Sequence, residues 1–310
     1  MTEKAIKLIK DKLPGVDIRL NEPLGKHTTF KIGGPVSAMI FPESADCITV
    51  ICDILNENEI TPLIIGNGSN ILADDNTHDI IVVSTSGLTD ISFVDSNIFS
   101  SQEYTGIKAD AGVLLSNLAV FACENSLTGL EFSHGIPGTV GGAVVMNAGA
   151  YGGEIKDVVY ETTAYNSRDG KLMLTAADND FSYRKSIFST NNDLLLSTTF
   201  KLKKGIKEDI RQTMDDLSIR RNESQPLTYA SAGSTFKRPK EGYAAALIEQ
   251  AGLKGFSVGG AQVSEKHSGF IINRGDATFS DVMAIIEHVQ EAVFKQTGIQ
   301  LEPEVKIIRE

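Results

Sequence analysis

The segment Gly135–Gly153 places seven glycines among 19 residues, whereas the whole chain has 28 glycines among 310 residues. Ordering so many glycines is entropically expensive, so a fold keeps them where the backbone must turn sharply or come close to another group. Two interpretations are open for this segment alone. It forms a set of tight turns between strands, or it brings backbone N–H groups close to the phosphate oxygens of a ligand. It contains no GxGxxG, so the dinucleotide fingerprint of a Rossmann fold is not supported.

A second glycine-rich segment, Gly66–Asn70, follows a short apolar strand expected at Pro62–Ile65. It offers backbone N–H groups together with the hydroxyl of Ser69 and the side-chain amides of Asn67 and Asn70. By itself it is equally consistent with a turn at the end of a strand. Two such loops in adjacent subdomains can clamp one diphosphate between them, and this pairing is more informative than either loop alone.

Composition limits the class of protein. A chain of 310 residues is long enough for two or three domains. Its net charge of −11 argues against nucleic acid as a partner, because phosphate backbones require a basic surface, but a small anionic ligand needs only a few local cations. Three cysteines without CxxC spacing and five scattered histidines indicate neither a disulfide framework nor a metal site. The apolar runs are too short to cross a bilayer and the N-terminus is typical of an amphipathic helix, so we expect a cytoplasmic protein without a membrane partner.

Apolar periodicity and turn signals predict an α+β protein in three parts, residues 1–86, 87–224 and 225–300. In the first part we expect an N-terminal helix, a loop at Asn21–Lys26, strands at Thr28–Ile32, Ala38–Phe41, Pro62–Ile65 and Ile80–Val83, and a helix at Asp46–Asn56. In the second we expect strands at Ile91–Val94, Thr105–Ala109, Val158–Asn166, Lys171–Thr175 and Leu194–Leu202, a linker at Lys203–Gly205, and helices at Leu114–Asn125 and Glu208–Arg221. In the third we expect a loop at Ser231–Lys240, helices at Ala244–Ala251 and Ser280–Thr297, and a strand at Gly269–Asn273. A closing strand at Leu301–Ile308 is expected to complete the second part.

Several segments resemble a known family of flavoenzymes. Thr28–Gly34, Gly66–Asn70 and Gly135–Gly153 are similar to the flavin-binding segments of the UDP-N-acetylmuramate dehydrogenases, also called UDP-N-acetylenolpyruvoylglucosamine reductases. The first two are shared more loosely with flavoproteins of the vanillyl-alcohol-oxidase and p-cresol-methylhydroxylase type. Four further segments resemble the reductase family specifically: Phe181–Ser186, Ser231–Pro239, Val263–Phe270 and Leu301–Val305. The resemblance runs from about residue 20 to the end of the chain. It implies a two-subdomain FAD-binding module of that type, followed by a C-terminal α+β substrate-binding domain.

The resemblance also implies a reaction. NADPH reduces non-covalently bound FAD, and the flavin passes a hydride to C3 of the enolpyruvyl ether of UDP-N-acetylglucosamine. Protonation at C2 then gives UDP-N-acetylmuramate, a precursor of peptidoglycan. Two alternatives remain: another FAD oxidoreductase of the same fold that acts on a different small substrate, and a non-catalytic nucleotide-sugar binding protein.

This chemistry requires an acid within hydrogen-bond reach of C2 and a cation near the carboxylate that takes up electron density. By resemblance, Ser234 donates the proton to C2 and Arg184 holds the carboxylate with its planar guanidinium. Period-two alternation places Glu302 and Glu304 on the same face of the closing strand, so spacing cannot choose between them. The family pattern selects Glu304 to act with Arg184.

The resemblance assigns further residues to ligands. Those expected around FAD are Thr29, Gly66, Asn67, Gly68, Ser69, Asn70, Ile136, Pro137, Gly138, Gly141, Gly142, Asn147, Gly149, Gly153, Arg221 and Lys306. Those expected around the UDP-sugar are Tyr183, Gln225, Lys237, Arg238, Lys266 and His267. The longer form of the family carries an inserted loop whose tyrosine closes over the substrate. Only 50 residues separate Arg184 from Ser234, so this chain resembles the shorter form, and the residue that covers the substrate is left open.

Overall fold

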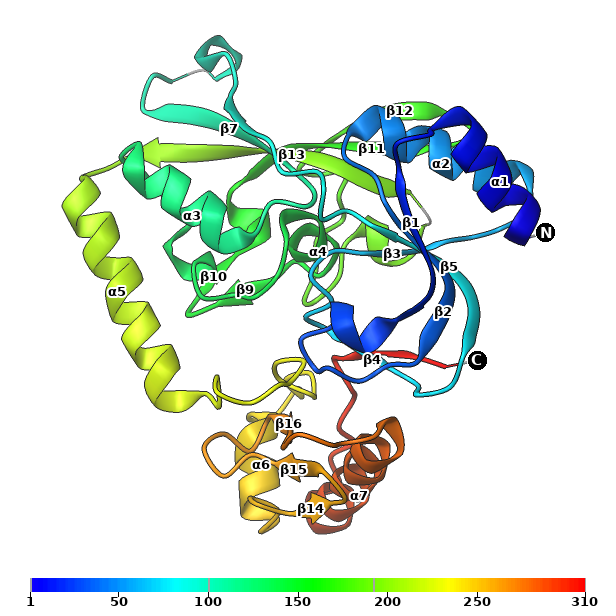
Figure 1. Cartoon of the computed structure of the whole chain (residues 1–310). Helices are drawn as coiled ribbons and strands as arrows, with labels where there is room; N and C mark the ends of the chain where they lie inside the picture. The colour runs from blue at the N-terminus through cyan, green and yellow to red at the C-terminus, as the bar shows by residue number, and fades with distance from the viewer. Residues whose placement is uncertain (1, 100, 192, 310) are drawn as a thin grey trace. The chain divides into compact units, whose positions relative to one another are not determined.

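The computed structural model describes residues 2–99, 101–191 and 193–309, and they form two compact units (Figure 1). Unit 1 comprises residues 1–19, 38–67 and 80–220. Unit 2 comprises residues 20–37, 68–79 and 221–310. The chain therefore passes from unit 1 to unit 2 inside the Gly66–Asn70 segment, between Asn67 and Gly68. No described helix is both long and apolar enough to cross a membrane.

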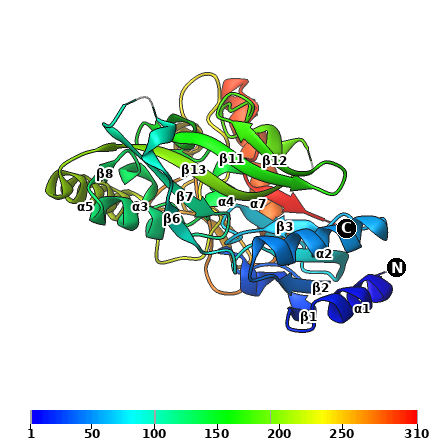
Figure 2. The ribbon, with the colours of Figure 1, turned by 90° about the horizontal axis from the view of Figure 1, so that it is seen from above.

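Unit 1 contains a six-stranded antiparallel sheet with the order β12-β11-β13-β7-β6, in which β8 also pairs with β13 (Figure 2). Its strands are β6 (Ile91–Phe93), β7 (Tyr104–Asp110), β8 (Leu127–Thr128), β11 (Val159–Asn166), β12 (Gly170–Thr175) and β13 (Leu194–Lys204). The expected antiparallel sheet is confirmed. The expected linker at Lys203–Gly205 is wrong for its first two residues, because Lys203 and Lys204 continue β13 and pair with Thr128 and Leu127.

Helices cover this sheet and enclose the largest apolar core of unit 1. They are α3 (Leu115–Glu124), α4 (Val140–Val145) and α5 (Lys207–Ser224). The side chain of Thr139 caps α4 by accepting a hydrogen bond from Gly142 N, so the helix begins within the glycine-rich segment. That segment ends in a two-stranded hairpin, β9 (Gly149–Ala150) with β10 (Gly153–Glu154).

The N-terminal part forms a second layer, in which α1 (Thr2–Lys12) packs against α2 (Ala45–Glu57), as Figures 1 and 2 show. A four-stranded sheet has the order β1-β2-β5-β3, and its strands are β1 (Asp17–Pro23), β2 (Pro35–Phe41), β3 (Leu63–Ile65) and β5 (His78–Ser84). The first expected loop is wrong at its start, since β1 runs through Asn21 to Pro23.

The expected strand Thr28–Ile32 is also wrong. Its β-branched residues favour a strand by propensity. The backbone turns instead, with Lys31 in the left-handed region at φ 58° and its N–H donating to Thr28 O at 3.2 Å. The turn lets Phe30 and Ile32 both reach the apolar core of unit 2.

Unit 2 packs two helices on a three-stranded antiparallel sheet. These elements are α6 (Ala244–Gln250), β14 (Ser257–Val258), β15 (Ala261–Val263), β16 (Ile271–Asn273) and α7 (Phe279–Thr297). A capping box of Thr278 and Asp281 begins α7, and left-handed Gly298 ends it. Both expected helices are confirmed.

The closing strand is shorter than expected. Only β17 (Lys306–Ile308) is regular, and it pairs in parallel with β4 (Ile71–Ala73). Its partner therefore lies in the first expected part of the chain, and not in the second part that it was expected to complete. The remaining short turns are 3-10 helices: η1 (Leu24–His27), η2 (Ser96–Ile98), η3 (Glu131–Ser133), η4 (Ile155–Asp157) and η5 (Ile187–Ser189).

Candidate functional site

The two glycine-rich segments meet in unit 1. The side-chain amide of Asn67 donates to Pro137 O at 2.7 Å. A Cβ atom added at Gly66 would lie 2.2 Å from Thr139 Oγ1, so only glycine allows this approach. The juxtaposition expected from the sequence is thus present for Gly66–Asn67 and Pro137–Thr139.

The glycines differ in what their N–H groups do. Gly141 N donates to Ala111 O at 2.8 Å, and Gly142 N donates to Thr139 Oγ1 at 3.3 Å. These two N–H groups are therefore engaged within the protein, and Gly141 serves close packing on Ala111. Across the described ranges, the N–H groups of three consecutive loop residues, Asn67–Ser69, donate to no protein acceptor. Free N–H groups in a row make an anion-binding concavity.

In unit 2 the rest of this loop is tied to the turn that carries Thr29. Gly68 has φ 58°, and an added Cβ atom would lie 2.1 Å from His27 O. Thr29 N donates to Gly68 O at 3.3 Å, and Thr29 Oγ1 donates to Ser231 O at 2.7 Å. Two expected flavin-binding segments are therefore joined to the loop that leads to Ser234.

Ser234 and Glu304 lie on adjacent extended segments of unit 2. Ser234 forms an isolated antiparallel bridge with Phe270, and Glu304 N donates to Thr235 O at 2.7 Å. Glu302 differs from Glu304 in its surroundings. It is exposed, and its carboxylate lies 3.2 Å from Lys237 Nζ. Glu304 is half-buried beside the Ser234 segment, which favours it over Glu302 as the residue that acts at the site.

Arg184 lies in unit 1 on a tight turn in which Ser182 bridges to Lys185. It has φ 55°, donates from Nη2 to Gly149 O at 3.3 Å, and stacks 5.2 Å from the ring centre of Tyr183. The turn is therefore fixed against the β9–β10 hairpin.

Asn147 explains how that hairpin is held. It is fully buried, and its Nδ2 donates to Ser182 O at 3.0 Å and to Glu154 Oε2 at 3.1 Å. Hydrogen bonding and charge from Lys156, together with the Asn147 bond, hold the pKa of the Glu154 carboxyl below its usual value. The Asn147 side chain thus supports the turn of Arg184, a role that sequence reasoning missed when it grouped Asn147 with the flavin contacts.

Glycines 149 and 153 are likewise required by packing. An added Cβ atom would lie 2.6 Å from Gly153 O at Gly149, and 2.5 Å from the ring of Phe132 at Gly153. The dense glycines at the end of the segment therefore build a hairpin that lies against an aromatic ring.

The residues expected around the UDP-sugar in unit 2 each have a defined environment. The guanidinium of Arg238 stacks 4.1 Å from the ring centre of Tyr243, an exposed aromatic residue that sequence reasoning missed. Nζ of Lys266 hydrogen-bonds Asn222 O. The buried Oε1 atom of Gln225 has no hydrogen-bond partner within the described part of the chain. An unpaired buried acceptor is costly, and a ligand N–H or O–H would satisfy it.

His267 adds a titratable group to this set. Burial lowers the pKa of its imidazole, and Nδ1 accepts a hydrogen bond from Gly269 N at 3.2 Å. The ring lies edge-on to Phe270 at 4.9 Å. The histidine is thus held neutral beside the segment that pairs with Ser234.

The expected site residues divide between the two units. Unit 1 carries Gly66, Asn67, Ile136, Pro137, Gly138, Gly141, Gly142, Asn147, Gly149, Gly153, Tyr183 and Arg184. Unit 2 carries Thr29, Gly68, Ser69, Asn70, Arg221, Gln225, Ser234, Lys237, Arg238, Lys266, His267, Glu304 and Lys306.

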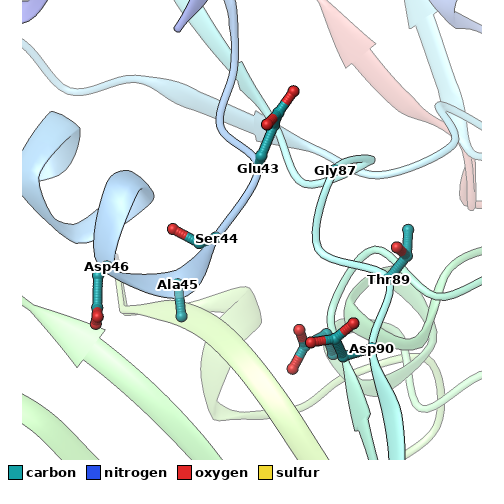
Figure 3. Close-up of a pocket in the computed structure, with 8 residues that line it drawn as sticks. Glu43, Ser44, Ala45, Asp46, Gly87, Thr89 and Asp90 are labelled. Carbon is teal, nitrogen blue, oxygen red and sulfur yellow. The ribbon is translucent and has the colours of Figure 1, made fainter. Parts of the chain in front are cut away.

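A pocket of about 270 Å³ in unit 1 contains none of these residues (Figure 3). It is lined by Glu43, Ser44, Ala45, Asp46, Gly87, Thr89, Asp90 and Asp110. Burial, and then the nearby charge of Asp90, raises the pKa of the Asp110 carboxyl. Its four carboxylates would repel an anionic diphosphate. The described residues include no group of three or more His, Cys, Asp or Glu that could hold a metal ion.

Comparison with known proteins matches both halves of the chain. Residues 36–176 match the FAD binding domain family, and residues 225–308 match the C-terminal domain of UDP-N-acetylenolpyruvoylglucosamine reductase. The expected fold class is confirmed.

Full-length relatives agree with these matches. The chain is 45% identical to the UDP-N-acetylenolpyruvoylglucosamine reductase of Caldanaerobacter subterraneus subsp. tengcongensis and 44% identical to that of Agathobacter rectalis, each over 100% of both chains. The crystal structure of the Thermus caldophilus reductase superposes with a TM-score of 0.76 at 30% identity, covering 95% of this chain and 99% of that one. The chain belongs to the UDP-N-acetylenolpyruvoylglucosamine reductase family of FAD-dependent oxidoreductases.

Proposed function

We propose that the chain reduces the enolpyruvyl ether of UDP-N-acetylglucosamine to UDP-N-acetylmuramate, with NADPH as reductant and FAD as the bound carrier. The observation that carries the proposal is the hydrogen bond from Glu304 N to Thr235 O, at 2.7 Å. It keeps two acid–base groups of the expected constellation, Ser234 and Glu304, on neighbouring segments of one unit. Another flavoenzyme reaction would leave this pairing without a role.

The glycine loops fit a flavin diphosphate. Gly66 and Gly68 have no room for a side chain, and the unengaged N–H groups of residues 67–69 offer donors to phosphate oxygens. We assign FAD to these loops, to Thr29 and to the segment from Ile136 to Gly153, with Arg221 and Lys306 supplying positive charge. When bound, FAD accepts an electron pair from NADPH and delivers a hydride to C3 of the enolpyruvyl group.

The chain's own residues control the proton and the developing charge. Ser234 donates a proton to C2 of the substrate. Arg184 pairs with the substrate carboxylate through its guanidinium fork and stabilises the enolate. Glu304 acts with Arg184 on that enolate. Tyr183, Gln225, Lys237, Arg238, Lys266 and His267 bind the UDP-sugar, and the exposed Tyr243 beside Arg238 is a candidate for covering it.

The substrates also indicate where the protein works. Both are small dissolved anions, and NADPH is made in the cytoplasm, so we place the enzyme there. Because the net charge is −11, we expect neither nucleic acid nor a membrane surface as a partner. We retain residues 1–224 as the flavin module and 225–300 as the substrate domain.

Rapid mixing tests the proposal in two steps. The purified protein should be yellow, its flavin absorbance should bleach with NADPH, and the enolpyruvyl substrate should restore it. Protein that binds no FAD, or reduced flavin that oxygen but not the substrate reoxidises, would contradict the proposal. Ser234→Ala should keep the bleaching step and slow the restoring step by about 100-fold or more, as expected for loss of a general acid. Full restoration in this variant would remove Ser234 from the role.

A further inference from the structure

Thr235 lies between the two segments that carry the proposed acid–base groups. Its N–H donates to Gly269 O at 2.8 Å, and its carbonyl accepts from Glu304 N at 2.7 Å. The preceding residue, Ser234, bridges to Phe270. Thr235 is therefore the residue through which three extended segments are held in register.

The side chain of Thr235 adds a bond that main-chain pairing does not supply. Thr235 is only 3% exposed, and its Oγ1 accepts a hydrogen bond from Ile271 N at 3.2 Å. Ile271 is itself buried, so without this acceptor its N–H would be left unpaired at a cost of about 1–3 kcal/mol. The hydroxyl thus locks the Ser234 segment to the start of β16.

Ser234 has little else to fix its position. Gly233, just before it, has φ 76° and open space around it. The Ser234 side chain is exposed, and within the described ranges its hydroxyl makes no hydrogen bond to the protein. The location of the hydroxyl then depends on the backbone that follows, which is the backbone that Thr235 anchors.

We propose that Thr235 is a positioning residue for the reaction, acting through Ser234 and Glu304 and touching neither substrate nor flavin. This inference rests on the proposed function of Ser234. A shift of the Ser234 segment would misplace the proton donor from C2, and misplacements of about 1 Å cost reaction rates about 100-fold.

The test compares Thr235→Val, which keeps the shape and removes the acceptor, with Thr235→Ser, which keeps the acceptor. Thr198→Val is the matched control. Thr198 is fully buried on β13 of unit 1, and its hydroxyl has no partner among the described residues. All three holoenzymes are reduced with NADPH and then mixed with the enolpyruvyl substrate. Hydrogen exchange at the Ile271 amide reports the lost bond without depending on turnover.

We expect Thr235→Val to slow reoxidation by the substrate about 10- to 100-fold, through kcat and with KM little changed. Reduction by NADPH should stay as in Thr198→Val, and exchange at Ile271 should accelerate. Thr235→Ser should restore the reoxidation rate to within about threefold of wild type. Rapid reoxidation in Thr235→Val would overturn the inference, as would an equal loss in Thr235→Ser.

Two further results keep the outcomes separable. If Ser234→Ala slows reoxidation and Thr235→Val does not, only the inference on Thr235 fails. If Ser234→Ala has no effect, the role of Ser234 itself fails. Should Thr235→Val not fold, Thr235→Cys takes its place, since sulfur is a weak acceptor and should give an intermediate loss. Wild-type reoxidation in that variant would also overturn the inference.

Discussion

The side-chain amide of Asn70 donates to the backbone carbonyl of Glu304 at 3.1 Å, and the carbonyl of Asn70 accepts from Lys306 N at 2.9 Å. One residue of the expected flavin loop therefore holds the segment of the expected catalytic glutamate on both sides. Because Glu304 N is bonded to Thr235, the chain of contacts continues to Ser234. Flavin binding and positioning of the acid–base groups thus depend on the same short stretch of backbone.

Asn70→Asp tests this connection. The substitution keeps the size of the side chain but sets a carboxylate oxygen against the Glu304 carbonyl, so we expect a loss of about 1–3 kcal/mol in the free energy of unfolding. We also expect weaker FAD binding and at least about tenfold lower kcat. Titration of the apoprotein with FAD, followed by flavin fluorescence, measures the first effect. Asn76→Asp adds the same charge at an exposed site and should leave both quantities near wild type. Equal behaviour of the two variants would contradict the connection.

Gly68→Ala should abolish FAD binding. The new Cβ atom would lie 2.1 Å from His27 O, and the residue would also keep an unfavourable φ of 58°. Gly252→Ala is the control, because Gly252 has φ 74° but nothing within 4 Å of an added Cβ atom. It should cost only about 1 kcal/mol of stability and retain FAD. Chemical denaturation and FAD titration compare the two. Normal FAD affinity in Gly68→Ala would show that the loop does not need this close approach.

The sequence predicted the meeting of the glycine loops but not how each glycine is used. Glycine density signals a close approach, whether the approaching group is a ligand or the protein itself. Gly66 allows contact with Thr139, while Gly141 and Gly153 make room for Ala111 and Phe132. Sequence alone cannot separate these cases, because the neighbour comes from a distant part of the chain.

The same limit explains the elements that were wrong. The residues from Thr28 to Ile32 favour a strand locally, but tertiary packing directs both Phe30 and Ile32 into one core and forces a turn at Lys31. The helices were predictable, because their apolar periodicity is long and their capping residues are local. The choice of Glu304 over Glu302 rested on family resemblance, and the structure adds the physical distinction that Glu302 is exposed and paired with Lys237.

Thr198→Val should stabilise the protein. The hydroxyl of Thr198 is fully buried in β13 and unpaired within the described chain, so it carries a desolvation cost without a compensating bond. Valine has nearly the same shape, and we expect a gain of about 1 kcal/mol in the free energy of unfolding. Urea denaturation measures it. Thr162→Val is the contrasting variant, since its buried hydroxyl donates to Asn179 Oδ1 at 3.0 Å and its loss should destabilise. A destabilised Thr198→Val would mean that the hydroxyl has a partner in solution.

His267 should make the protein less stable in mild acid. Burial lowers the pKa of its imidazole below the ordinary value of 6.5, with Lys254 lowering it further and Glu249 opposing the shift. The unfolded chain therefore takes up a proton at a higher pH than the folded chain does, and protons favour unfolding. Its contribution to the free energy of unfolding is intact above pH 6.5, decreases as the pH falls below that value, and levels off once the folded-state pKa is passed.

Protonation also conflicts with the hydrogen bond that Nδ1 accepts from Gly269 N, and Gly269 O is the acceptor for Thr235 N. His267→Gln removes the titration and keeps a side-chain acceptor. Unfolding by urea at a series of pH values between 7 and about 5 should show a shallower loss of stability in this variant than in wild type. An NMR titration of the His267 ring gives the direct comparison. A ring pKa at or above 6.5, with parallel stability curves for the two proteins, would show that the imidazole is not held neutral by its surroundings.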